Sequence, residues 1–169
     1  MSDFSKLLER LVAGGVDFVI VGGFAGVVHG CTYVTQDIDI CCDFSPANLL
    51  RLQQALAELH PVHRMTPSRK KLALTEKTCK QLKNLYLDTD IGQLDCLSSI
   101  DGLGDYRKVK QASQLIDVED MQLHALRLDA LIESKKALSR PRDKEAILQL
   151  EAIRKLKSEK RSHPQPPAI

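Results

Sequence analysis

Four consecutive residues, Asp37-Ile38-Asp39-Ile40, alternate acidic and apolar side chains. Successive side chains of a β-strand point to opposite faces, so this pattern predicts a strand with both carboxylates on one face and both isoleucines on the other. Side chains two positions apart on a strand lie about 6.5 Å from each other, close enough for two carboxylates to share a pair of cations. The sequence therefore predicts a sheet with an acidic face that can bind metal.

Two further features extend this acidic strand. The pair Gly22-Gly23 precedes it, with thirteen residues between Gly23 and Asp37, and two glycines can bring backbone close to a phosphate. A third acid, Asp95, stands among apolar residues further along the chain. Clustered carboxylates repel one another and are costly to bury, and divalent cations such as Mg²⁺ relieve both costs. The alternative is that each aspartate caps a turn or pairs with an arginine.

The composition is that of one globular domain. A length of 169 residues, 43% of them hydrophobic, allows one real core. A net charge of +2 argues against binding nucleic acid through overall charge, and the lack of Trp with 4% aromatics argues against base-stacking platforms. We expect no membrane segment, no secretory signal and a cytoplasmic location, with the five cysteines buried and reduced.

Hydrophobic periodicity and capping signals predict an α+β fold. We expect one domain over residues 1–157 and a disordered polar tail over residues 158–169. A first helix is capped by Ser2 or Asp3 and ends at Gly14-Gly15. The expected strands span residues 17–21, 32–42, 72–75, 85–87, 93–97, 114–118 and 121–126, and the other expected helices span residues 24–29, 46–59, 129–138 and 142–157, with Asp129 capping the third of these four.

Together these residues resemble the DNA polymerase β-like nucleotidyltransferase superfamily. The resemblance rests on Val21-Gly22-Gly23, on Asp37-x-Asp39, on the later Asp95 and on a segment from Leu131 to Asp143, and it covers roughly residues 15–155. The segment is similar to one in small stand-alone bacterial members, which include minimal nucleotidyltransferases and AbiEii-type toxins. The resemblance implies a short mixed β-sheet flanked by helices, with a C-terminal helical segment.

The resemblance also implies the reaction and its metal ligands. Asp37 and Asp39 would hold two Mg²⁺ ions that clamp the triphosphate of an NTP such as ATP. Asp95 would bind the metal beside the attacking hydroxyl and help to deprotonate it. In-line attack on the α-phosphorus would then expel pyrophosphate.

Other positions would bind the nucleotide. Gly22 and Gly23 would approach the β- and γ-phosphates through backbone N–H groups, Lys135 would neutralise phosphate charge, and Asp143 would fix that lysine or contact the nucleotide. Thr35 either bonds a phosphate or a metal ligand, or is only a β-branched residue that favours a strand. Lys135 equally suits a helix C-terminus, where a cation is favourable. Many members carry Ser where this chain has Gly23, which bears on triphosphate binding.

The expected activity is transfer of a nucleoside monophosphate from an NTP to a hydroxyl of an RNA, a protein or a small molecule such as an aminoglycoside or lincosamide. The chain shows no extra domain for a template, which argues against a polymerase. A toxin–antitoxin role with an antitoxin partner is an expectation by fold analogy. The rival reading is a non-catalytic nucleotide-binding regulator or antitoxin module. The basic stretch 64–83 either docks an acceptor nucleic acid or is a solvated loop.

Overall fold

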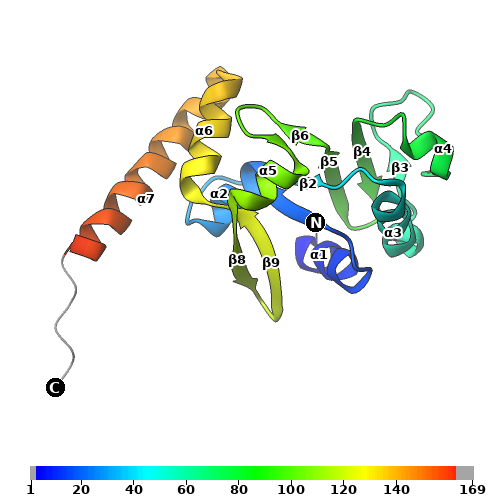
Figure 1. Ribbon diagram of the computed structural model, residues 1–169, viewed down its shortest axis with the longest axis horizontal. Helices are drawn as coiled ribbons and strands as arrows, with labels where there is room; N and C mark the ends of the chain where they lie inside the picture. Colours follow the sequence, from blue (N-terminus) through cyan, green and yellow to red (C-terminus); the bar gives the residue numbers. More distant parts are fainter. Residues whose placement is uncertain (1–2, 163–169) are drawn as a thin grey trace.

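A computed structural model describes residues 3–162, and its centre is a seven-stranded mixed sheet in the order β3-β4-β5-β2-β1-β9-β8 (Figure 1). A separate two-stranded sheet pairs β6 with β7. The strands are β1 Phe18–Val21, β2 Asp37–Cys42, β3 Val62–His63, β4 Asn84–Thr89, β5 Gly92–Leu97, β6 Ser99–Ile100, β7 Gly104–Asp105, β8 Ser113–Val118 and β9 Met121–Leu126. The helices are α1 Phe4–Ala13, α2 Gly22–Val28, α3 Pro46–Leu56, η1 Ala57–Leu59, α4 Glu76–Cys79, α5 Tyr106–Gln111, α6 Leu128–Leu138, η2 Pro141–Asp143 and α7 Lys144–Ser162.

The middle of the sheet follows the alternation expected from the sequence. Strand β2 pairs antiparallel with β1 and parallel with β5, so the sheet is mixed. Ile38, Ile40 and Leu94 are fully buried, while Asp37 and Asp39 on the opposite face are only partly covered. The predicted α+β fold, with a short mixed sheet flanked by helices, is confirmed.

Two helices supply leucines to the same core. Asp3 is the N-cap of α1 and accepts a hydrogen bond from the Lys6 N–H, as the capping signal predicted. Ser45 caps α3 in the same way, with Pro46 in the first turn. The fully buried leucines of the two helices recur at helical spacing and belong to the main core cluster: Leu7, Leu8, Leu11, Leu49, Leu52 and Leu56.

The C-terminal helical segment consists of α6 and the long helix α7, which runs away from the sheet (Figure 1). Helix α7 continues to Ser162, so the predicted start of a disordered tail at residue 158 is too early. The run from Arg154 to Arg161 is rich in lysine, arginine and glutamate, which are good helix formers, and this explains the longer helix. The rest of the predicted tail, residues 163–169, lies outside the described residues.

Three local predictions are wrong. The expected strand 32–42 begins only at Asp37, because β1 ends at Val21, opposite Asp39, and residues before Asp37 lack a partner there. Residues 72–75 form no strand, since the N–H groups of Leu72 and Leu74 bond to Pro61 O and to the Gln53 side chain. Helix α6 begins at Leu128 with Arg127 as N-cap, so Asp129 lies in the first turn, where its charge favours the helix dipole.

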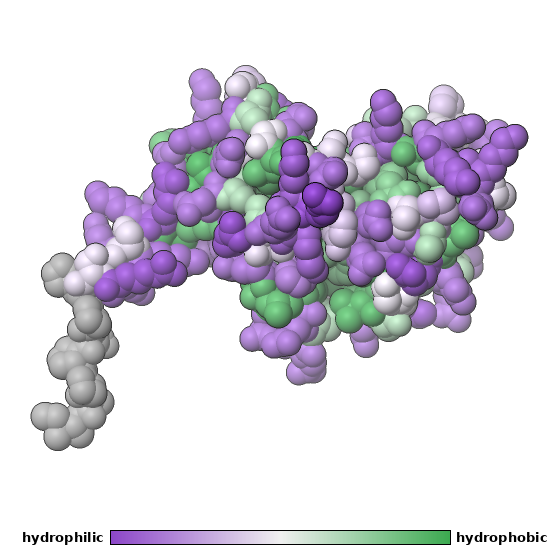
Figure 2. All heavy atoms as spheres, in the orientation of Figure 1, coloured by the Kyte–Doolittle hydropathy of each residue, from purple (hydrophilic) through white to green (hydrophobic). Residues whose placement is uncertain are grey.

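Two other sequence expectations concern cysteines and membranes. All five cysteines are free and buried, as predicted. Within residues 3–162 no helix combines the length and the apolar character needed to cross a membrane. Figure 2 shows a mostly hydrophilic face, on which hydrophobic residues form smaller areas between charged ones.

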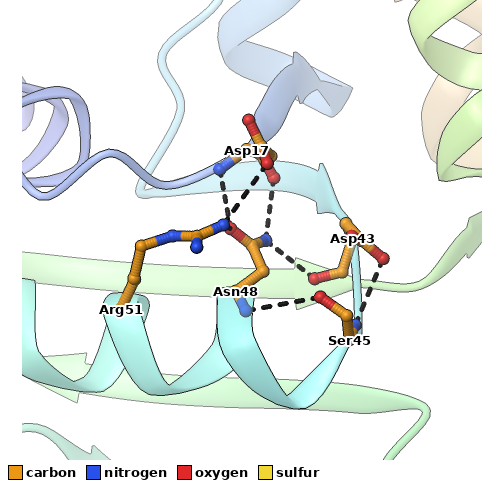
Figure 3. Close-up of polar contacts among 5 residues, drawn as sticks. All are labelled: Asp17, Asp43, Ser45, Asn48 and Arg51. Carbon is orange, nitrogen blue, oxygen red and sulfur yellow. Dashed lines mark hydrogen bonds and ion pairs between the residues drawn. The ribbon is translucent and has the colours of Figure 1, made fainter.

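A buried asparagine ties α3 to the sheet (Figure 3). The Asn48 side chain accepts a hydrogen bond from the Asp17 N–H at 2.8 Å and donates to the carbonyls of Asp17 and Asp43 at 3.1 and 2.7 Å. Asp17 precedes β1 and Asp43 follows β2, so one side chain joins the start of one strand to the end of its neighbour. Arg51 donates to the Asn48 oxygen, and Ser45 caps the helix beside it.

We expect Asn48→Ala to lower the free energy of unfolding by about 2–4 kcal/mol, because it removes three hydrogen bonds and leaves the Asp17 N–H and the Asp43 carbonyl without these partners at a fully buried position. Urea denaturation measures the change. The matched control is Gln54→Ala on the exposed face of α3, which should cost less than about 0.5 kcal/mol. Equal losses in the two variants would show that the Asn48 bonds do not hold the strands.

Candidate active site

The sheet register places three aspartates together. Asp39 of β2 and Asp95 of β5 are direct partners on neighbouring parallel strands, and Asp37 precedes Asp39 on the same face. One carboxylate oxygen from each of the three residues lies within 4.8 Å of the others. These acids come from distant parts of the sequence, and the sheet brings them together.

Gly22 lets the chain pass close to this cluster. It follows Val21, which pairs with Asp39, and its φ of +63° is a left-handed conformation that glycine adopts easily. A β-carbon at Gly22 would overlap the Asp39 side chain, with Cγ at 2.7 Å and Cβ at 2.8 Å. Two features therefore require glycine at this position: the positive φ and the lack of space for a β-carbon.

The carboxylates stand in a cleft of about 630 Å³. Its lining comes from the start of β2, from β4 and β5, and from the α6–η2 segment. The cleft brings together all eight residues that the sequence singled out: Gly22, Gly23, Thr35, Asp37, Asp39, Asp95, Lys135 and Asp143.

The lining of the cleft also carries an ion-pair cluster. Lys135 Nζ lies 3.3 Å from Asp143 Oδ1, and both side chains are buried. Arg140 donates through Nε to Asp143 Oδ2 at 2.5 Å and through Nη2 to Oδ1 at 3.2 Å. Burial opposes ionisation of Asp143, but these hydrogen bonds and the nearby positive charges outweigh it and lower its pKa. Asp143 therefore fixes Lys135 and Arg140 at the cleft.

The carboxylate cluster is electrostatically costly. Burial raises the pKa of Asp39 to about 7, and the charges of Asp37 and Asp95 add to this effect, while the N–H of Gly23 and Lys135 oppose it. Burial also raises the pKa of Asp95, although an arginine partner acts in the opposite direction. A cation among these oxygens would favour the charged carboxylates and so offset both shifts.

The donor set fits a hard divalent cation. Three carboxylates offer only oxygen ligands, which Mg²⁺ prefers, and the cleft leaves room for the phosphate oxygens that usually complete its coordination. Carboxylates with a raised pKa in a cleft are candidates for a functional site.

Thr35 has a different local role from the one predicted for a strand residue. It lies before β2 begins, and its hydroxyl donates to the Asp37 carbonyl at 2.9 Å. A β-carbon at Gly23 would lie 3.0 Å from Thr35 Oγ1, so the threonine hydroxyl occupies the space beside Gly23. This side chain thus supports the strand end that carries the acids.

Sequence reasoning missed Arg64, which lies within the basic stretch 64–83. Its Nη2 forms an ion pair with Asp95 Oδ1, and its guanidinium carbon lies 5.9 Å from the centre of the Tyr86 ring. Asp95 therefore pairs with an arginine, which was one alternative to a metal site, and it also belongs to the carboxylate cluster. Only the three-dimensional pairing of β3 with β4 brings Arg64 here, so no local pattern in the sequence marks it.

Comparisons with known proteins place the fold. No family model matches the chain, and no curated protein resembles it significantly in sequence. Among solved structures, the chain is similar to ANT(2″)-Ia in complex with adenylyl-2″-tobramycin, with a TM-score of 0.56 and 15% identity over 94% of this chain and 95% of that one. It is also similar to the lincosamide antibiotic adenylyltransferase LnuA bound to lincomycin, with a TM-score of 0.59 and 17% identity over 90% and 98% of the two chains.

A third similar structure is a candidate nucleotidyltransferase from Thermotoga maritima, with a TM-score of 0.54 and 20% identity over 92% of this chain and 91% of that one. All three matches span nearly the whole of both chains. The protein therefore has the nucleotidyltransferase fold, as the sequence motifs implied.

Replacing Gly22 should disturb the acidic cluster as well as the backbone. We expect Gly22→Ala to destabilise the protein by more than the matched change Gly15→Ala, which has a similar φ of +67° but open space around the added carbon. The strain of φ alone is about 1–2 kcal/mol, and the excess in Gly22→Ala reports the clash with Asp39. Chemical denaturation of both variants measures this excess, and equal losses would contradict the packing argument.

The raised pKa of Asp39 predicts how stability changes with pH in the absence of metal. The folded state holds this proton up to pH about 7, above the ordinary range of the unfolded chain, so wild-type stability should fall as the pH rises from about 4 to 7. Asp39→Asn cannot ionise and should gain on the order of 2 kcal/mol relative to wild type between pH 5 and pH 8.

Urea denaturation in EDTA at the two pH values measures this difference. Asp90→Asn, which changes an exposed aspartate at the β4–β5 turn, is the control and should show no comparable gain. A constant difference between Asp39→Asn and wild type at both pH values would contradict the assigned pKa.

Proposed function

We propose that this protein is a metal-dependent nucleotidyltransferase that moves a nucleoside monophosphate from an NTP to a hydroxyl of a small molecule. The observation that carries the proposal is the meeting of Asp37, Asp39 and Asp95 in one cleft, opposite the buried pair of Lys135 and Asp143. The nucleotidyltransferase fold supports it.

Asp37, Asp39 and Asp95 would hold Mg²⁺, as two ions, in this cleft. Bound divalent cations supply charge stabilisation of the phosphoryl oxygens during transfer. Asp95 is the third carboxylate, and we assign it to accept the proton of the attacking hydroxyl. The oxygen of that hydroxyl bonds to the α-phosphorus, the bond to the bridging oxygen breaks, and pyrophosphate leaves.

The remaining residues bind and orient the nucleotide. The backbone of Gly22 and Gly23 lines the same cleft as the carboxylates, and we assign its N–H groups to bind phosphate oxygens. Lys135 lies across the cleft and neutralises phosphate charge, with Asp143 fixing its ammonium group. Thr35 keeps the start of β2 in position and offers its hydroxyl beside Gly23.

A small-molecule acceptor fits the site better than RNA. A cleft of about 630 Å³ lies within the usual range for small-molecule sites. The basic stretch 64–83 also has fewer free charges than its sequence suggests, because Arg64, Arg69 and Lys80 form ion pairs with Asp95, Asp88 and Glu76. The similar structures of ANT(2″)-Ia with adenylyl-2″-tobramycin and LnuA with lincomycin motivate aminoglycosides and lincosamides as first acceptors to test.

Other parts of the functional expectation stay predictions. An RNA or protein acceptor, a toxin–antitoxin role with an antitoxin partner and a cytoplasmic location have no further support from the described residues. The rival function, a nucleotide-binding regulator without catalysis, predicts stabilisation by Mg²⁺ and NTP but no transfer.

The test is transfer of label from α-labelled NTPs with Mg²⁺ to a panel of aminoglycosides, lincosamides, total RNA and protein. We expect a labelled small molecule, and a loss of at least about 10³-fold in Asp39→Ala, since metal ligation contributes several kcal/mol to the transition state. Asp90→Asn is the matched control and should retain wild-type transfer, because that exposed side chain pairs with His60 away from the cleft.

Three outcomes would contradict the proposal. Transfer that survives in both Asp37→Ala and Asp39→Ala would remove the carboxylates from the mechanism. Label on RNA alone would overturn the small-molecule acceptor. Thermal stabilisation by Mg²⁺ and NTP with no transfer to any acceptor would favour the non-catalytic regulator.

A further inference from the structure

Arg64 contacts the acidic cluster although it lies on a different part of the chain, directly after β3. The residue follows β3, and its backbone N–H donates to the Tyr86 carbonyl at 2.8 Å, which anchors the main chain to β4. The side chain then extends past the Tyr86 ring to the carboxylate of Asp95. With only 22% of the Arg64 side chain and 13% of the Asp95 side chain exposed, water screens this ion pair weakly.

The guanidinium group is incompletely bonded in this position. The Nε–H of Arg64 is buried and has no hydrogen-bond partner, although arginine Nε normally donates. Oδ1 of Asp88 lies 3.9 Å from that atom, too far for a hydrogen bond. The other oxygen of Asp88, Oδ2, already accepts from Arg69, so the carboxylate is held in place with Oδ1 facing Arg64.

Arg64 therefore has two carboxylate partners within reach. Asp88 and Asp95 face the same side of neighbouring strands, since Asp95 pairs with Tyr86 and Asp88 lies two residues further on. Shortening the Nε to Oδ1 distance from 3.9 Å to a normal hydrogen bond of about 2.9 Å needs a side-chain shift of roughly 1 Å. The backbone anchor at Tyr86 need not move.

We propose that Arg64 is a built-in cation that occupies Asp95 in the metal-free protein and moves to Asp88 when Asp95 takes up a divalent cation. This inference rests on the metal site of the proposed function. Arg64 offsets the negative charge of the three aspartates when no metal does so. After the move, Asp88 satisfies the Nε–H that is unpaired beside Asp95, so Asp88 favours metal uptake although it is no ligand.

The proposal predicts effects of opposite sign from two neighbouring residues. Arg64→Met removes the competitor and should tighten Mn²⁺ binding at least tenfold, because a positive charge near a divalent cation is lost. Asp88→Asn removes the negative charge of the second partner, so that Arg64 favours Asp95, and should weaken Mn²⁺ binding several-fold. In the Arg64→Met background the same Asp88→Asn change should alter the affinity less than about twofold.

The experiment is titration of the full chain with Mn²⁺, without nucleotide, following free Mn²⁺ by electron paramagnetic resonance. Arg142→Met is the matched control, because it removes the same charge from the same cleft, and Arg142 forms no ion pair among the described residues. It should change the affinity less than about threefold. Circular dichroism of every variant checks that the fold persists.

Several results would overturn the inference while leaving the proposed function intact. These are wild-type affinity in Arg64→Met, equal tightening in Arg64→Met and Arg142→Met, or an equal effect of Asp88→Asn with and without Arg64. Absence of Mn²⁺ binding in wild type and in Arg64→Met alike would instead overturn the metal site itself, and this inference with it.

Discussion

Repulsion among three clustered, partly buried carboxylates is the constraint on which the rest of this structure depends. Asp37, Asp39 and Asp95 present oxygens within 4.8 Å of one another, and burial with mutual repulsion raises the pKa of Asp39 to about 7. Such an arrangement lowers stability unless positive charge compensates it. Arg64 on one side and Lys135 on the other supply part of that compensation, and a divalent cation would supply the rest.

The pairing of the strands in the sheet holds the three aspartates close together. Parallel pairing of β2 with β5 sets Asp39 beside Asp95, and Gly22 turns the chain where β1 ends against the same aspartate. Asn48 holds the far end of the same two strands, β1 and β2, to α3 through three hydrogen bonds. Packing and hydrogen bonds elsewhere in the domain thus offset the stability that the carboxylate cluster costs, as is common for functional sites.

Local patterns predicted most of the site but not its electrostatic balance. Alternation in β2, the glycine pair and an acid among apolar residues each carry a local signal, so Asp37, Asp39, Asp95 and Gly22 could be identified from the sequence. Arg64 could not, because its role depends on the β3–β4 pairing and on a side chain that crosses a strand. The start of β2 was misplaced for a similar reason, since strand length depends on the partner strand rather than on β-propensity.

A crystal structure with Mn²⁺ and a non-hydrolysable NTP analogue tests the central claim most directly, because anomalous scattering locates the metal independently of the protein. We expect Mn²⁺ bonded to carboxylate oxygens of Asp37 and Asp39, with the triphosphate between Gly22-Gly23 and Lys135. A nucleotide bound outside this cleft, or anomalous density away from the aspartates, would contradict it.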